Sequence, residues 1–150
     1  MTNAVITRLL FGKTDVIQML NGALGGLVAI TAEPLAPSPE LAMLIGAIGG
    51  AIVRFGSSLL LKFQIDDVVG AIPVHLFAGI FGTLAVCLST DVSLAAQITG
   101  ILSVNIFVFV ISYIIWSIMK ATIGIRISAE AEEMGTDTVE VGVSAYAIRD

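Results

Sequence analysis

His75 is the residue of this sequence best suited to proton transfer. It is the single histidine, and it lies in the middle of a long apolar stretch. A neutral imidazole carries one hydrogen-bond donor and one acceptor, so it can relay a proton or hold a small polar molecule. An ionisable side chain in a membrane helix is costly and usually faces a cavity or a polar partner. Two interpretations stay open: a functional site, or a histidine that only hydrogen-bonds a neighbouring helix.

The residues around His75 leave its helix face nearly free of bulk. Positions three, four and seven residues away share one face of an α-helix, and here they are small: Ala71, Ala78, Gly79 and Gly82. Pro73 lies two residues before the histidine, removes a backbone donor and frees a carbonyl near Val69. The sequence predicts either a helix-packing surface or the wall of a narrow lumen.

Other polar residues have plainer interpretations. Asp66 and Asp67 form an adjacent acid pair, but aspartate is a preferred N-cap, so we expect a helix cap there. Asn21 and Asn105 lie at or within apolar stretches, where hydrogen bonding between helices is the usual role. Cys87 and one histidine cannot make a metal site. No phosphate loop, heme motif or nucleophile elbow is found, so we predict neither a cofactor nor an enzyme.

The composition indicates an integral membrane protein. Hydrophobic residues make up 57% of the chain and charged residues 13%, with a mean hydropathy of +1.01. Soluble domains usually contain about 25% charged residues. The net charge of −5 reflects acids near the C-terminus, and no basic stripe predicts nucleic-acid binding.

The apolar runs predict an all-α membrane protein with four transmembrane helices, at about residues 15–32, 39–62, 67–88 and 92–127. Prolines interrupt the chain after the first, and Ser38 and Pro39 suit the start of the second. The last run is long enough to be tilted, bent near Gly100, or extended beyond the membrane. Residues 1–14 form a cytoplasmic lead-in or a helix remnant, and residues 128–150 a polar cytoplasmic tail.

Basic residues set the expected topology. They lie before the first predicted helix, at the end of the second and at the end of the fourth: Arg8, Lys13, Arg54, Lys62, Lys120 and Arg126. The loops at residues 33–40 and 89–93 contain none. The positive-inside rule then predicts a multi-pass protein of the cell membrane, with both termini cytoplasmic. Glycine clusters in the first two helices predict close helix packing.

Several segments resemble one family. Residues 21–32 (Asn-Gly-Ala-Leu-Gly-Gly-Leu-Val-Ala-Ile-Thr-Ala) resemble the N-G-x-L-A-G-L-V-A-I-T-A segment of ammonium transporters of the Amt/Rh family. Residues 45–50 look like that family's next helix, and residues 66–83 resemble the helix with its second pore histidine. A likeness to the family's cytoplasmic tail rests on Gly135, Asp137, Glu140, Gly142, Ala145 and Tyr146.

The resemblance implies the last helices of an eleven-helix inverted-repeat fold. It implies a homotrimer in which each subunit conducts ammonium nitrogen past two histidines, with ammonium losing its proton at the outer mouth. His75 matches the second histidine, and Ala71 becomes a candidate pore-lining residue. The family's tail can bind P-II-type nitrogen regulators.

This sequence departs from the family pattern because it has four predicted spans and no second histidine. We therefore expect ammonium transport by a C-terminal fragment or truncated form of a channel-like transporter. The alternative is a non-transporting regulatory, assembly or ammonium-sensing membrane protein built on the same scaffold.

Overall fold

The computed structural model describes residues 1–33 and 38–144, and these ranges contain helices and turns but no strand. The chain divides into two compact units, Met1–Asn105 and Ile106–Asp150. The helices of the first unit are α1 (Thr2–Phe11), α2 (Val16–Ile30), α3 (Pro39–Lys62), the π-helical turn η1 (Ile72–Phe77), α4 (Ala78–Ala85) and the 3-10 turn η2 (Val86–Leu88). Helix α5 (Leu94–Thr122) continues into the second unit, which also holds α6 (Ala129–Met134) and the π-turn η3 (Asp137–Val141).

Short polar side chains start the helices of the first unit. The Asp15 carboxylate accepts from the Gln18 backbone N–H at 3.0 Å and begins α2. The Ser38 hydroxyl accepts from the Leu41 N–H at 3.3 Å, and Pro39 takes the first position of α3. These are the side-chain types that satisfy unpaired N–H groups at a helix N-terminus.

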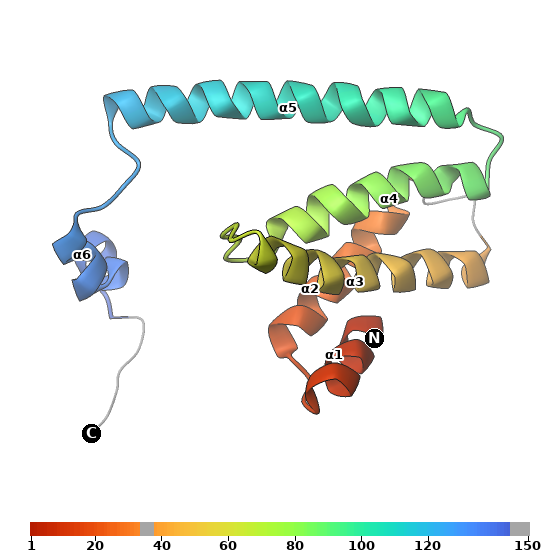
Figure 1. Ribbon diagram of the computed structural model, residues 1–150, viewed down its shortest axis with the longest axis horizontal. Helices are drawn as coiled ribbons and strands as arrows, with labels where there is room; N and C mark the ends of the chain where they lie inside the picture. Colours follow the sequence, from red (N-terminus) through yellow and green to blue (C-terminus); the bar gives the residue numbers. More distant parts are fainter. Residues whose placement is uncertain (34–37, 145–150) are drawn as a thin grey trace. The chain divides into compact units, whose positions relative to one another are not determined.

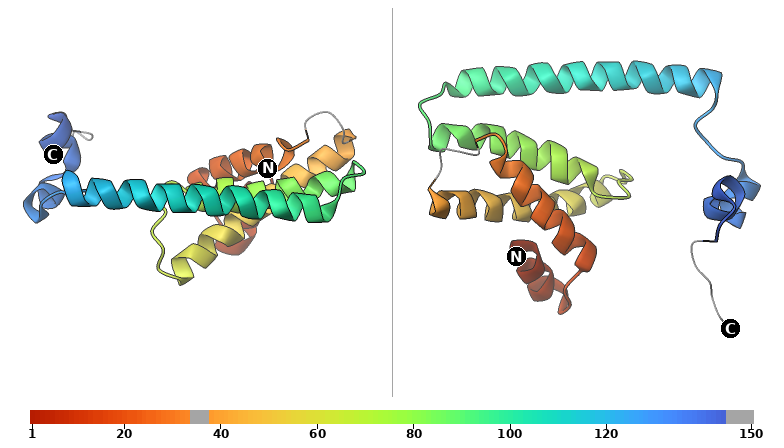
Figure 2. Two further views of the ribbon diagram at one scale, coloured as in Figure 1. Left: turned by 90° about the horizontal axis from the view of Figure 1, so that it is seen from above. Right: turned by 180° about the vertical axis from the view of Figure 1, so that it is seen from behind.

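Glycines bring α2 and α3 into direct backbone contact where the two helices cross (Figure 1, Figure 2). A Cβ added at Gly49 would lie 2.7 Å from the Gly25 carbonyl oxygen, and one at Gly26 would lie 2.9 Å from that of Gly46. Each distance is too short for a real Cβ. The predicted packing of glycine clusters is therefore the main contact of the first unit.

The remaining helices pack around this pair. Helix α4 lies so close to α2 that a Cβ at Gly82 would collide with the Ala29 carbonyl oxygen. Ala29, Ile45 and Ala85 form a small buried core where α2, α3 and α4 meet. Helix α1 contacts both α2 and α3 (Figure 2).

Helix α1 is docked through polar residues. Asn3 and Thr7 are 1% and 0% exposed, and the Asn3 side-chain amide donates to the Gln18 carbonyl at 2.6 Å. Gly22 of α2 leaves the room that Asn3 occupies. This segment is thus a helix packed on its neighbours, and its cytoplasmic position stays a prediction.

Two helices are long and apolar enough to cross a membrane, Pro39–Lys62 and Leu94–Thr122. The other two apolar helical stretches, Val16–Ile30 and Ile72–Leu88, are shorter. A 15-residue helix is roughly 22 Å long, less than a hydrocarbon core of about 30 Å. Four spans therefore stay a prediction.

Two expected features differ in the structure. The helix predicted from residue 67 starts later, at Ile72, because Gly70 has a φ of +76° and interrupts the helical backbone. The fourth helix, predicted over residues 92–127, is shorter and runs as one unbroken α-helix from Leu94 through Gly100 to Thr122 (Figure 1). A single glycine costs a helix interior about 1 kcal/mol relative to alanine, which does not interrupt a helix of 29 residues.

We expect Gly49→Ala to lower the stability of the first unit by about 1–3 kcal/mol, because the added methyl must push α2 and α3 apart. The matched control is Gly46→Ala on the same helix, where a Cβ lies 3.9 Å from its nearest neighbour, the Gly26 carbonyl oxygen. Denaturant titration in detergent micelles, followed by circular dichroism, measures both. Equal losses for the two variants would contradict the glycine contact.

Candidate functional site

His75 lies in η1, the π-helical turn that precedes α4. The Ala78 backbone N–H donates to the carbonyls of Pro73 and His75, so the first of these bonds spans five residues. Pro73 is buried against α3, where a Cβ at Gly56 would lie 2.9 Å from the Pro73 Cβ. Pro73 cannot supply the N–H that a regular α-helix needs at this position. Proline and tight packing therefore coincide with a wider helical turn beside the histidine.

Two side chains hold the start of this helix. Both oxygens of the Asp67 carboxylate accept backbone N–H groups, from Ala71 at 2.8 Å and Ile72 at 2.9 Å. The Asn21 side-chain amide, from α2, donates to the Val69 carbonyl at 2.9 Å. Val69 is four residues before Pro73, so its carbonyl is the one expected to lack a helical donor.

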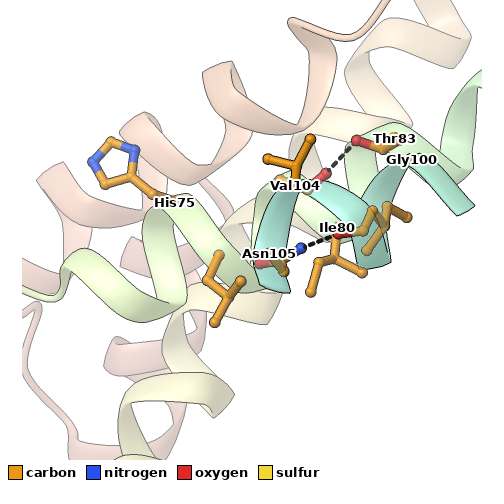
Figure 3. A pocket seen from close by; sticks show the side chains of 9 residues that line it. His75, Ile80, Thr83, Gly100, Val104 and Asn105 are labelled. Carbon is orange, nitrogen blue, oxygen red and sulfur yellow. Dashed lines mark hydrogen bonds between the residues drawn. The ribbon is translucent and has the colours of Figure 1, made fainter. Parts of the chain in front are cut away.

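His75 borders a cavity of about 430 Å³ within the first unit (Figure 3). The wall from η1 and α4 consists of His75, Leu76, Gly79, Ile80 and Thr83. The wall from the first turns of α5 consists of Gly100, Ile101, Val104 and Asn105. The positions on α5 recur at the spacing of one helix face, so a single face of that helix completes the cavity.

The cavity is apolar except at three side chains. The Thr83 hydroxyl donates to the Gly79 carbonyl at 2.9 Å, and the Asn105 amide donates to the Ile101 carbonyl at 2.7 Å (Figure 3). The Thr83 hydroxyl hydrogen is thus used within its own helix, whereas the Asn105 amide has a second N–H and a carbonyl oxygen besides this bond. The His75 ring is exposed, and across residues 1–33 and 38–144 no side chain hydrogen-bonds to it. Its ring N–H and its ring nitrogen acceptor can therefore form hydrogen bonds with a small polar molecule or with a group of another protein segment.

The predicted small-residue face around His75 is only partly right. Gly79 borders the cavity with the histidine. Ala78 and Gly82 are buried among α2, α3 and α4, and Gly82 contacts Ala29. A shared face requires α-helical spacing, whereas the π-turn adds residues per turn and shifts later positions around the axis.

The other predicted site residues lie elsewhere. Ala71 immediately precedes η1, is exposed, and does not line the cavity. Asp66 shares with Asp67 and Asn21 a second cavity of about 220 Å³, between α2, α3 and the loop before η1. Of the acid pair, Asp67 supplies both bonds of the helix cap.

The predicted tail residues fall in the second unit, and four of them lie within the described residues. Gly135 and Gly142 adopt left-handed backbone angles, with φ of +90° and +74°, on either side of η3. Asp137 and Glu140 belong to η3. Ala145 and Tyr146 lie outside the described residues.

Sequence reasoning missed the α5 wall of the cavity. The sequence singles out Asn105 by its polarity, but nothing in it distinguishes Gly100, Ile101 and Val104 within a helix that is apolar on all sides. Thr83 was also missed, although it lies eight residues after His75, about two helical turns. Among the described residues, no group of three His, Cys, Asp or Glu side chains could hold a metal ion.

We expect Asp67→Ala to destabilise the first unit by about 1–2 kcal/mol, because two backbone N–H groups lose their acceptor. The control is Asp66→Ala, which removes the same charge from the neighbouring position and should stay within about 0.5 kcal/mol. Detergent-micelle unfolding measures both. If Asp66→Ala were the more damaging change, the assignment of the cap to Asp67 would be wrong.

Comparison with known proteins now identifies the family. The model of the Ammonium Transporter Family matches residues 1–146. Ammonium transporter Amt2 of Archaeoglobus fulgidus is 39% identical over 97% of this chain and 36% of its own length. Amt2 of Methanocaldococcus jannaschii is 34% identical over 97% of the chain and 37% of its length, and the ammonium transporter of Bacillus subtilis is 32% identical over 89% and 37%. The chain thus spans little more than a third of these relatives, and it belongs to the ammonium transporter family.

Proposed function

We propose that this chain forms the C-terminal part of a channel-like ammonium transporter, in which His75 relays a proton along the conduction path. The observation that carries the proposal is the placement of the single histidine at an apolar cavity, in a chain that belongs to this family. The relatives are named as ammonium transporters.

The chemistry of the cavity favours neutral ammonia over the ammonium ion. A charged ion that enters an apolar space loses hydration energy that the walls do not return, whereas an uncharged molecule loses much less. Ammonium therefore has to lose its proton before it passes. The His75 imidazole can accept that proton on one ring nitrogen and donate from the other.

A membrane setting with four spans completes the proposal. Helices α3 and α5 have the length to cross, and the two shorter helices, α2 and η1–α4–η2, would cross where packing against neighbours or local thinning of the bilayer compensates for length. The predicted topology places both termini and the loop around Asp66 and Asp67 in the cytoplasm.

Assembly with other protein is part of the same proposal. A binding site of an inverted-repeat transporter lies between its two halves, so this chain requires the other half for a complete path. The family resemblance supports a homotrimer. It also supports contact of a P-II-type regulator with the tail around Gly135, Asp137, Glu140 and Gly142.

We expect a chimera that places the N-terminal part of the Archaeoglobus fulgidus relative ahead of this chain to take up methylammonium. In that chimera, His75→Ala should lower uptake at least about tenfold, because the proton relay is lost. Uptake of radiolabelled methylammonium by cells that lack their own transporter measures the change. Cys87→Ala, on the same segment but outside the cavity lining, is the control for expression and folding.

Unchanged uptake in the His75→Ala chimera would remove this histidine from the conduction path. The DNA upstream of Met1 supplies a second test of the fragment hypothesis. An in-frame coding region for the other helices supports a fragment of a transporter, whereas a separate start site at Met1 favours the regulatory or sensing alternative.

We also expect the 150-residue chain alone to conduct nothing, since a part of an inverted-repeat transporter that lacks the other repeat has no interface between repeats. The purified chain in liposomes should show the same ammonium permeability as empty liposomes, with the active chimera as the positive control. Ammonium currents above that background would mean that this chain builds a path by itself.

A further inference from the structure

Two side-chain hydrogen bonds tie the segment that carries His75 to residues of α2 and its end. The Asn21 amide donates to the Val69 carbonyl at the start of the segment, and the Ser89 hydroxyl donates to the Glu33 carboxylate at its far end. Only the first lies close to the histidine. The backbone next to this first bond is irregular, with Gly70 just before the turn η1 and Pro73 within it.

The Asn21 bond answers a specific need of this backbone. Pro73 has no N–H, so the Val69 carbonyl four residues earlier has no helical donor. The next carbonyl, that of Gly70, does have one, because the Val74 N–H donates to it at 3.2 Å. Asn21 therefore supplies from another helix a donor for a carbonyl that Pro73 and the irregular backbone at Gly70 leave without a helical partner.

The Asn21 side chain has little room to move around this bond. Gly70 has a φ of +76°, and a Cβ there would lie 2.6 Å from the Asn21 amide nitrogen. Val69, Gly70 and Asn21 together line the 220 Å³ cavity below η1. A change in the Asn21 side chain would move the Val69–Gly70 peptide, and with it the start of the turn that holds His75.

We infer that Asn21 is a positioning residue for His75, acting through the Val69 carbonyl. This inference rests on the proposed function for its transport consequence, but the structural part stands on the chain alone. Asp67 holds the donors at the start of the helix, and Asn21 holds the acceptor. The position of the imidazole at the edge of the cavity then depends on a residue 54 positions earlier in the sequence.

The sequence permits a test on the chain itself in lipid nanodiscs. Labelling valine carbonyl carbon and glycine nitrogen gives signals only from Val–Gly peptide bonds, of which there are two, at Val69–Gly70 and Val141–Gly142. The second lies in the tail and is an internal reference. Labelling histidine ring nitrogen reports His75 alone, because no other histidine is present.

Asn21→Leu, which keeps the size and removes the donor, should shift the Val69 carbonyl signal upfield and shift the His75 ring nitrogens. Asn21→Asp, which also lacks the donor, is the second variant in case the first does not fold. Asn3→Leu is the matched control, because Asn3 donates to the Gln18 carbonyl but does not touch the His75 segment. The Asn3 variant should leave both sets of signals in place, even if it lowers stability.

In the uptake chimera, Asn21→Leu should lower methylammonium uptake about tenfold, as expected when a reacting group is misplaced. Unmoved His75 signals in both Asn21 variants, or equal shifts in the Asn3 control, would overturn the positioning role. Failure of the unmodified chimera to take up methylammonium would instead count against the proposed function, and the nanodisc measurement would still decide the role of Asn21.

Discussion

The close backbone contact between α2 and α3 is the constraint on which the rest of the first unit depends. Within a bilayer, lipid tails are as apolar as leucine, so helices associate through close packing rather than by escaping water. The missing side chains of Gly25, Gly26 and Gly49 let the two backbones touch. This contact fixes α2 against α3, and α2 then offers Ala29 to Gly82 of α4 and Gly22 to Asn3 of α1. A side chain at the crossing would therefore disturb every other helix of the unit.

The packing of α2 on α3 also influences where the histidine lies, because a side-chain hydrogen bond connects α2 to the backbone of the segment that carries it. The helix that carries it begins irregularly, at a left-handed glycine and a proline, and such a start leaves backbone groups without partners. Asp67 accepts the free N–H groups and Asn21 donates to the free carbonyl. Asn21 belongs to α2, and α2 is held against α3 by the glycine contact. The placement of the imidazole therefore depends on that contact.

Much of the local structure could be predicted from residue types. Helices start at Asp15, Ser38 and Asp67 because these side chains accept hydrogen bonds from backbone N–H groups. The glycine clusters mark the helix contacts because larger residues would keep the two backbones apart. The register of the His75 face was harder, because the π-turn depends on tertiary packing of Pro73 against Gly56. The α5 wall of the cavity was harder still. That helix is apolar on all sides, so its sequence has no period that identifies an inward face.

The length and apolarity of α5 have a consequence for biogenesis. A helix of 29 residues with a mean hydropathy of 2.3 over its most apolar window can enter a bilayer with all of its backbone bonds made internally, before it meets another helix. Helix α3 can do the same. The short helices α2 and η1–α4 are different, since their glycine-rich faces gain little from lipid and much from contact with α3. The long helices can therefore insert first, as independent anchors, and the elements that shape the histidine site fold onto them afterwards.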